Sequence, residues 1–257
     1  MSRLIMRSLL LSGFLLMAMP VIAAEGVREP HSPPAGWPHE GMTGTFDRAA
    51  LQRGFQVYKQ VCSACHGLKL VAYRNVADLG FSPAEVKAIA AEYKVTDGPN
   101  DQGEMFERPA RPSDHFVKPF VNDAAARAAN GGALPPDLSL IVKARKGHED
   151  YIYSLLTGFE EPPVGVKVAE GMHYNPYFPG HQIAMSPPLA EGAVTYADGT
   201  TASVAQMADD VTQFLTWAAE PKLEVRKQTG LKVLIFLTVF AFIMYGVKKK
   251  VWSKLSK

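Results

Sequence analysis

The chain has 257 residues, 27 Lys and Arg against 25 Asp and Glu, and a formal net charge of +2. With 47% hydrophobic and 20% charged residues, its composition is ordinary for a globular protein of one large or two small domains and excludes a chain too polar to fold. The charge is uneven, because residues 25–220 carry 16 Lys and Arg against 24 Asp and Glu, whereas residues 221–257 carry 9 against 1. An acidic body therefore precedes a basic tail, and we expect no nucleic-acid partner.

The first residues have the pattern of a secretory signal peptide. Arg3 and Arg7 form a basic start, residues 9–19 are largely apolar, and small residues follow in VIAAEG. Such a segment is removed on export, and we assign it to residues 1–24. A first membrane anchor is the alternative, which the short and proline-interrupted apolar run disfavours.

A second apolar run covers residues 231–247, and the basic segment KKKVWSKLSK follows it at once. About 20 apolar residues cross a bilayer, and positive charges mark the cytoplasmic side. We therefore expect an exported body over residues 25–222, a transmembrane anchor over 223–248 and a short basic cytoplasmic tail over 249–257. A buried core helix is the less favoured alternative.

The first half of the body contains two clear helix signals. Asp47 can cap a helix that runs through RAALQRGFQVYKQVCSACHG and stops at Gly67. Its apolar residues recur every three or four positions, as on one face of a helix. Ser82 and Glu85 form a capping box before a second helix. Irregular segments are expected around these helices, at residues 25–45 and 96–121.

The second half of the body is expected to add helices, a hairpin and one long irregular loop. Asn122 caps a predicted helix over residues 122–132, and apolar periodicity predicts another over 203–221. Residues 137–145 and 149–158 are also interpreted as helices. An Asp-Gly pair in TYADGTT predicts a hairpin. The proline-rich stretch 159–193 shows neither period, and loops of that length are usually functional or disordered. Its aromatic residues predict that it packs on the body: Tyr174, Tyr177 and Phe178.

Both cysteines of the chain lie in one short motif, VCSACHGL, at Cys62 and Cys65, and His66 follows directly. A structural zinc site normally needs four Cys or His ligands, and no second pair has suitable spacing. A thiol–disulfide pair is expected near a βαβ unit rather than at a helix end. C-x-x-C-H is typical of covalent haem, in which both thiols form thioethers and the histidine binds iron. One helical turn would direct the three side chains to one face.

A second axial ligand is expected for an electron-transfer haem, and Met/His ligation raises its potential. Met185 stands out, because IAMSPPL places it beside two prolines that stiffen the backbone. The other candidates remain open at this point: Met105, Met172, His115, His148, His173 and His181.

Longer motifs make the chain resemble the cytochrome c1 family, the haem-bearing, membrane-anchored subunits of cytochrome bc1 complexes. The resemblance lies in VCSACHGL, GGALPPDLSLIVKARKGHEDYIYSLLTGF, MHYNPYFPGHQIAMSPPL, VTQFLTWAAEP and the C-terminal anchor. It implies a mainly α protein, with the class I c-type cytochrome fold, long loops and one C-terminal transmembrane helix. The first and last helices of the body would pack across each other. It also implies that Cys62 and Cys65 hold one covalent haem c with His66 and Met185 as axial ligands.

The resemblance implies further contacts to the haem. Arg145 and Tyr151 would approach a haem propionate, and Pro135 and Pro136 would lie beside the haem on the histidine side. Some bacterial relatives carry another cysteine pair that ties down the loop before the axial methionine. This chain has no cysteine for such a tie, so packing of the aromatic loop would have to replace it.

The function implied is an electron relay within a quinol–cytochrome c reductase. The haem would take electrons from the Rieske iron–sulfur subunit, beside cytochrome b, and pass them to a soluble cytochrome c. The body would lie in the periplasm, anchored in a bacterial inner membrane. A haem subunit of another electron-transfer complex and a non-haem redox or interaction module remain as alternatives. Acidic candidates for docking a basic acceptor are Asp97, Asp101, Glu104 and Glu107.

Overall fold

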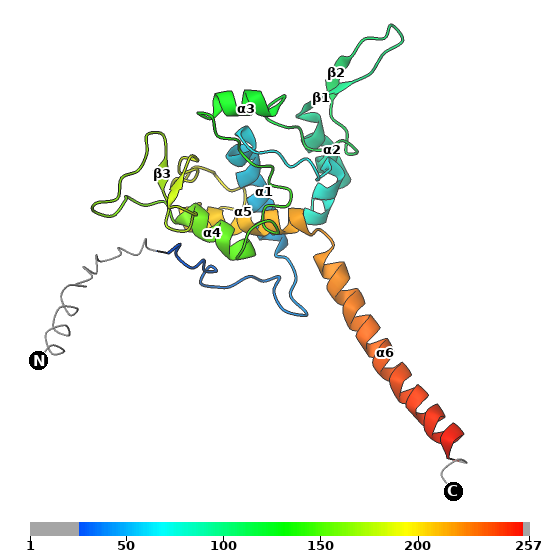
Figure 1. Cartoon of the computed structure of the whole chain (residues 1–257). Coiled ribbons are helices and arrows are strands. Elements are labelled where there is room, and N and C mark those ends of the chain that lie inside the picture. Colours follow the sequence, from blue (N-terminus) through cyan, green and yellow to red (C-terminus); the bar gives the residue numbers. More distant parts are fainter. Residues whose placement is uncertain (1–25, 254–257) are drawn as a thin grey trace, which may run out of the picture.

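The computed structural model describes residues 26–253 and is mainly helical, as predicted (Figure 1). The signal peptide expected at residues 1–24 lies outside the described residues. In chain order the elements are α1 (Arg48–Gln60), the 3-10 helices η1 (Cys62–Ala64) and η2 (Tyr73–Leu79), α2 (Pro83–Ala91), β1 (Lys94–Asp97), β2 (Phe106–Pro109), α3 (Asp123–Ala129), α4 (His148–Thr157), β3 (His173–Tyr174), β4 (Gln182–Ile183), α5 (Val204–Ala219) and α6 (Leu223–Trp252).

The core lies where α1 and α5 cross, with α4 beside α5 (Figure 1). Phe55 and Tyr58 of α1 are buried, and the centroid of each ring lies 5.7 Å from that of Phe214 in α5. Trp217 continues this aromatic cluster along α5. Burial of such large apolar side chains is the main source of folding free energy. The expected crossing of the first and last body helices is therefore confirmed.

Helix starts follow the predicted caps. The Asp47 carboxylate accepts a hydrogen bond from Ala49 N, and the Ser82 hydroxyl and Glu85 carboxylate bond to each other's backbone N–H groups. Asn122 and Ser203 cap α3 and α5 in the same way. These side chains satisfy N–H groups that have no partner within the first helical turn.

The predicted continuation of the first helix to Gly67 is wrong, because α1 ends at Gln60 and a 3-10 turn follows. The Ser63 hydroxyl donates to Lys59 O, so a side chain occupies an acceptor that the helix would use. Cys65 N instead bonds to Cys62 O, the i to i+3 pattern of a 3-10 turn.

The predicted helix over residues 137–145 is also wrong, since the segment forms a series of turns. The Asp137 carboxylate accepts from Ser139 N and from Lys69 N, and the Ser139 hydroxyl accepts from Leu70 N. These side-chain bonds tie the segment to a distant part of the chain and compete with helical hydrogen bonding.

The hairpin expected in TYADGTT is a turn without paired strands. Asp198 still forms an Asx turn, with its carboxylate 2.9 Å from Thr200 N. However, Gln56 of α1 donates to Thr195 O, so this carbonyl is bound by a side chain instead of a second strand. Conversely, β1 and β2 form an unexpected antiparallel pair that begins at Lys94 and extends into the predicted 96–121 loop, and their hairpin projects from the body (Figure 1).

The aromatic loop over residues 159–193 packs on the body, as predicted. Tyr174 and Tyr177 are buried, and Gly158 at the end of α4 lies directly beneath the Tyr177 ring. Asn175 is fully buried and donates to Leu155 O of α4 at 2.8 Å. The short pair β3–β4 closes the loop just before Met185.

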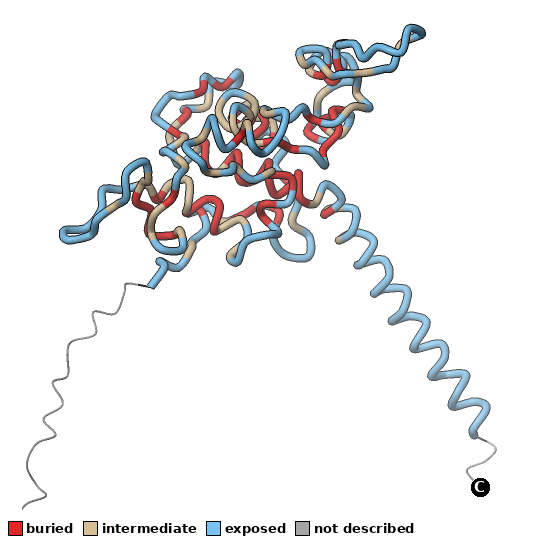
Figure 2. Tube along the Cα trace, turned by 45° about the horizontal axis from the view of Figure 1, so that its top comes forward, coloured by how far each residue is buried: buried red, intermediate tan, exposed pale blue. Residues whose placement is uncertain are grey.

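Helix α6 leaves the body as one exposed rod (Figure 2). Its first residue, Leu223, is buried against the body, whereas its apolar side chains beyond residue 230 are exposed. By length and composition it can cross a membrane. It covers the anchor predicted over 223–248 and continues to Trp252.

Candidate functional site

The motif Cys62–His66 forms a tight turn directly after α1. Cys65 N and His66 N both donate to Cys62 O, at 3.1 and 2.9 Å. The two thiols are half-buried and not bonded to each other. Burial, with a smaller effect of the neighbouring Cys65, raises the pKa of the Cys62 thiol to about 12, so this thiol is protonated at neutral pH. The turn thus presents two unbonded thiols beside one imidazole.

The imidazole of His66 is held in one tautomer. Its Nδ1 lies 2.7 Å from Pro136 O, and because a carbonyl oxygen only accepts, Nδ1 carries the proton and Nε2 keeps its lone pair. Burial lowers the pKa of His66, which keeps the ring neutral. Tyr58 of α1 donates to His66 O at 3.0 Å and supports the backbone from the other side. A neutral imidazole oriented by a backbone carbonyl is the usual state of a metal-binding histidine.

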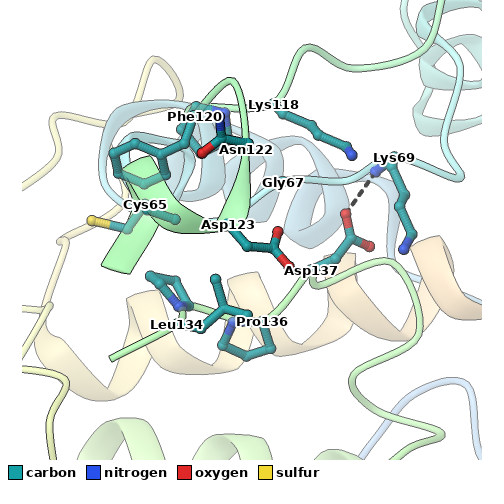
Figure 3. A pocket seen from close by; sticks show the side chains of 13 residues that line it. Cys65, Gly67, Lys69, Lys118, Phe120, Asn122, Asp123, Leu134, Pro136 and Asp137 are labelled. Carbon is teal, nitrogen blue, oxygen red and sulfur yellow. Dashed lines mark hydrogen bonds between the residues drawn. The ribbon is translucent and has the colours of Figure 1, made fainter. Parts of the chain in front are cut away.

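The segment that supplies Pro136 is bound to the chain that follows the motif. Leu138 N donates to Gly67 O at 2.8 Å, and the Asp137 carboxylate accepts from Lys69 N at 3.0 Å. Figure 3 shows the second of these bonds as a dashed line. These contacts keep the Pro136 carbonyl against the His66 ring, so the ring orientation does not depend on one hydrogen bond alone.

A pocket of about 250 Å³ lies beside this turn (Figure 3). Cys65 borders it on one side, and Leu134, Pro135 and Pro136 form another wall. The ring of Phe120 adds an apolar surface, and polar or charged side chains also line the pocket, from Lys69, Lys118, Asn122, Asp123 and Asp137. The structure therefore places both predicted prolines next to the cysteine–histidine motif.

Arg145 and Tyr151 also lie together, at the start of α4. Burial raises the pKa of Tyr151, while the Arg145 guanidinium acts in the opposite direction through its charge and a side-chain hydrogen bond. Arg145 is itself exposed, and it donates to Ala144 O at 3.1 Å. A fixed phenol beside an exposed guanidinium can bind a carboxylate.

Met185 is half-buried and lies two residues after the end of β4, on a segment separate from the cysteine–histidine turn. Its neighbour Ile183 is buried and pairs with His173 across β3–β4. Of the alternatives, Met105 lies beside the β1–β2 hairpin with 62% of its surface exposed. Nδ1 of His148 lies 3.3 Å from Val142 O.

Within residues 26–253, no three His, Cys, Asp or Glu side chains are grouped as a metal site. The described residues therefore supply no second ligand pair for the structural zinc site considered as an alternative. Sequence reasoning missed the roles of Tyr58 and Asp137, and it missed the bond from His66 to the Pro136 carbonyl. The run Pro135-Pro136-Asp137, shortly after the glycine pair at 131–132, was the available signal for this contact, because such a run predicts a rigid turn.

A model of the Cytochrome C1 family matches residues 37–255. The chain belongs to the cytochrome c1 family. It is 52% identical over 253 residues to "Cytochrome b/c1" of Bradyrhizobium diazoefficiens, covering 90% of this chain but 36% of that longer relative. It is 50% identical over 245 residues to "Cytochrome c1-2, heme protein, mitochondrial" of Solanum tuberosum, covering 95% and 93% of the two chains. "Cytochrome b-c1 complex catalytic subunit, mitochondrial" of Candida albicans is 50% identical over 224 residues, which cover 87% of this chain and 78% of the relative.

Proposed function

We propose that this cytochrome c1 family member is the haem subunit of a quinol–cytochrome c reductase and relays electrons one at a time. The observation that carries the proposal is the C-x-x-C-H turn, whose histidine is neutral and oriented by the Pro136 carbonyl at 2.7 Å. Two unbonded thiols and an unprotonated Nε2 on one turn fit a covalent haem. When bound, a haem supplies a one-electron ferric/ferrous couple.

The residues of this chain have separate tasks in that role. Cys62 and Cys65 would hold the haem through two thioethers, and His66 would bind its iron through Nε2. Met185 would supply the second protein ligand to the iron, and its thioether would favour the ferrous state. Pro135 and Pro136 exclude water on the histidine side, next to the pocket of Figure 3.

Arg145 and Tyr151 bind a haem propionate. Their side chains already interact, and Arg145 is exposed, so a carboxylate can approach both. A guanidinium and a phenol together give a propionate a charge-assisted and a neutral hydrogen bond. Arg145 and Tyr151 would thus orient a haem in addition to the residues that bind its iron.

We assign α6 as a single-pass anchor in a bacterial inner membrane. The three lysines at 248–250 lie on the cytoplasmic side and the body lies in the periplasm, after removal of residues 1–24. The partners are cytochrome b, the Rieske iron–sulfur subunit as electron donor and a soluble cytochrome c as acceptor. The acidic body favours a basic acceptor through complementary charge.

The four acidic docking candidates on the β1–β2 hairpin differ in whether their carboxylates already pair with a basic side chain of the hairpin. Asp97 forms an ion pair with Arg108, and Glu107 lies 3.7 Å from Lys94. Asp101 and Glu104 are exposed in the connection between the strands. These two residues are therefore the stronger candidates for a contact with the acceptor.

A pyridine haemochrome spectrum of the full-length protein, purified in mild detergent, tests the cofactor assignment. We expect the spectrum of a haem with two thioether bonds, retained after acid–acetone extraction. Cys62→Ser and Cys65→Ser together should abolish that retention. Co-purification of cytochrome b and an iron–sulfur protein tests the assembly, and a full-length protein without bound haem contradicts the proposal.

A further inference from the structure

At the start of α6, Arg226 pairs with Glu220 at the end of α5. Two further charged side chains, three residues apart on the same helix face, bind the start of α6 to the chain around the start of α1. The first is Glu224, whose Oε1 accepts a hydrogen bond from Phe46 N and whose Oε2 accepts from Arg48, both at 2.7 Å. Both oxygens of the carboxylate are therefore bound at the start of α1. Charge-assisted bonds of this kind are stronger than neutral ones.

The second side chain is Lys227, whose ammonium donates to the carbonyl oxygens of His39 and Gly44. These carbonyls belong to a tight loop that is closed by a 3.1 Å bond from Thr45 N to Pro38 O. A Cβ at Gly44 would lie 1.8 Å from another backbone oxygen of the same loop, so only glycine fits this turn. The loop is thus shaped to present two acceptors to one cation.

The loop is in turn fixed to the body. The Trp37 indole donates to the Asp150 carboxylate of α4 at 2.6 Å. Trp37, His39 and Phe46 are all at least 94% buried, and the rings of His39 and Phe46 are 5.0 Å apart. Segment 37–46 therefore joins α4, α6 and the start of α1, and it has little freedom to move separately from them.

Helix α1 connects this junction to the cysteine–histidine turn. It begins at Arg48, which Glu224 binds, and ends directly before the motif that starts at Cys62. Thirteen residues with a rise of 1.5 Å each make a strut of about 20 Å. Because α1 packs across α5, a tilt of α6 against α1 would change the orientation of the motif relative to the anchor.

We propose that Glu224 and Lys227 form a latch that holds α1, and with it the Cys62–His66 turn, at one orientation to the anchor helix. Both are positioning residues for the electron relay, and this last step rests on the proposed function. Opening the latch leaves the site intact but lets the body tilt over the membrane. The donor then meets the site in fewer productive arrangements.

A distance measurement tests the latch without reference to electron transfer. Nitroxide labels at Val121→Cys on the body and Val233→Cys on α6, both exposed positions, report the spread of distances in full-length protein in lipid nanodiscs. We expect Glu224→Gln combined with Lys227→Gln to broaden that distribution about twofold, because bonds to charged groups are lost. Glu160→Gln is the matched control, since its ion pair with Arg28 lies away from α6.

Arg48→Gln provides an independent variant, because it weakens the latch from the body side. Retained α-helical circular dichroism shows that each variant is folded. An unchanged distance distribution in the double variant and in Arg48→Gln overturns the latch. More than two labels per chain would show that Cys62 and Cys65 are free thiols, which contradicts the haem assignment. The distance comparison would then be made in chains in which Cys62 and Cys65 have been changed to Ser, and it would still decide the latch.

The positioning role is tested in the assembled complex. We expect the double variant to keep the parent midpoint potential and spectrum while the rate of haem reduction by the upstream donor falls. An unchanged rate together with a broadened distance distribution overturns the positioning role. A parent complex that transfers no electron to this subunit contradicts the proposed function instead, and the distance result still decides the latch.

Discussion

Gly54 of α1 lies directly against the backbone of Asp210 in α5. A Cβ built on Gly54 would be 2.0 Å from Asp210 O and 2.8 Å from Phe214 Cβ. The two helices therefore approach to a distance that only a residue without a side chain permits. The requirement is one of packing, since Gly54 is an ordinary helical residue within α1.

Gly54→Ala should destabilise the body strongly. Alanine gains about 1 kcal/mol in helix propensity, but forcing α1 and α5 apart costs about 3 kcal/mol or more. Thermal unfolding of the body, followed by circular dichroism, measures the net loss. Gly230→Ala is the control, because Gly230 is also helical and no atom lies within 4 Å of its added Cβ, so its melting temperature should not fall below that of the parent. Equal stability of both variants contradicts the close approach of the helices.

Asp210→Asn should be the most destabilising isosteric change at the α1–α5 crossing. Asp210 is fully buried and accepts three hydrogen bonds, at 2.9 to 3.1 Å, from the guanidinium of Arg53. Removing its charge leaves that guanidinium, which is 15% exposed, without its main partner, at a cost of about 3 kcal/mol. Asp198→Asn is the comparison, because Asp198 also binds Arg53 but is exposed. Denaturant unfolding should show a smaller loss in the free energy of unfolding for Asp198→Asn than for Asp210→Asn. A larger loss for Asp198→Asn is the contradicting result.

Met185→Leu should remove the second axial ligand and leave the fold and the thioether bonds in place. Leucine nearly keeps the volume, so the packing loss is about 1 kcal/mol. Without the thioether the ferric state is favoured, and the midpoint potential should fall by more than about 60 mV, a tenfold change for a one-electron couple. Redox titration and the loss of the methionine–iron absorption feature measure this. Met105→Leu and Met172→Leu are controls and should keep the parent potential. If Met185→Leu keeps the parent potential while one of these controls lowers it, the ligand assignment is refuted.

Electron delivery to a basic cytochrome c should slow as salt rises. The body carries 24 Asp and Glu against 16 Lys and Arg between residues 25 and 220, so it attracts a basic acceptor. Salt screens this attraction, because the Debye length falls from about 30 Å at 0.01 M to about 10 Å at 0.1 M. Stopped-flow rates under second-order conditions measure the slope. Asp101→Asn with Glu104→Gln should reduce it, and a flat rate for the parent argues against electrostatic docking.

Two truncations separate anchoring from stability. A chain that ends at Lys222 and one that ends at Gly230 should both leave the membrane fraction with haem bound, because the long apolar run of α6 begins after Gly230. The longer chain keeps buried Leu223 and both latch residues, so it should be more stable by about 2 kcal/mol. Thermal unfolding of the two soluble proteins gives this difference. Membrane retention of either chain contradicts the assignment of α6 as the anchor.

Local signals in the sequence were sufficient for most helices and for the motif. Asp47, Ser82, Asn122 and Ser203 each cap the helix that was expected after them, because a cap satisfies N–H groups within three residues of itself. The C-x-x-C-H spacing was equally local. The haem chemistry could therefore be predicted before any tertiary contact was known.

Local signals failed where a distant segment supplied the deciding contact. Residues 137–145 have a helical pattern but form turns, since Asp137 and Ser139 bind the backbone N–H groups of Lys69 and Leu70. The length of the first helix was overestimated for a different, local reason, because the Ser63 hydroxyl binds Lys59 O four residues before it at the end of α1.

The sequence by itself determined the cofactor motif, the order of the helices and the apolar C-terminal helix, because each depends on residues only a few positions apart. The tertiary structure alone decided that Pro136 orients His66 and that Gly54 sets the α1–α5 distance. It also decided that Glu224 binds the start of α1 and that Lys227 binds the loop before it. These contacts join residues 70 to 188 positions apart, and no periodicity or cap records such a pairing.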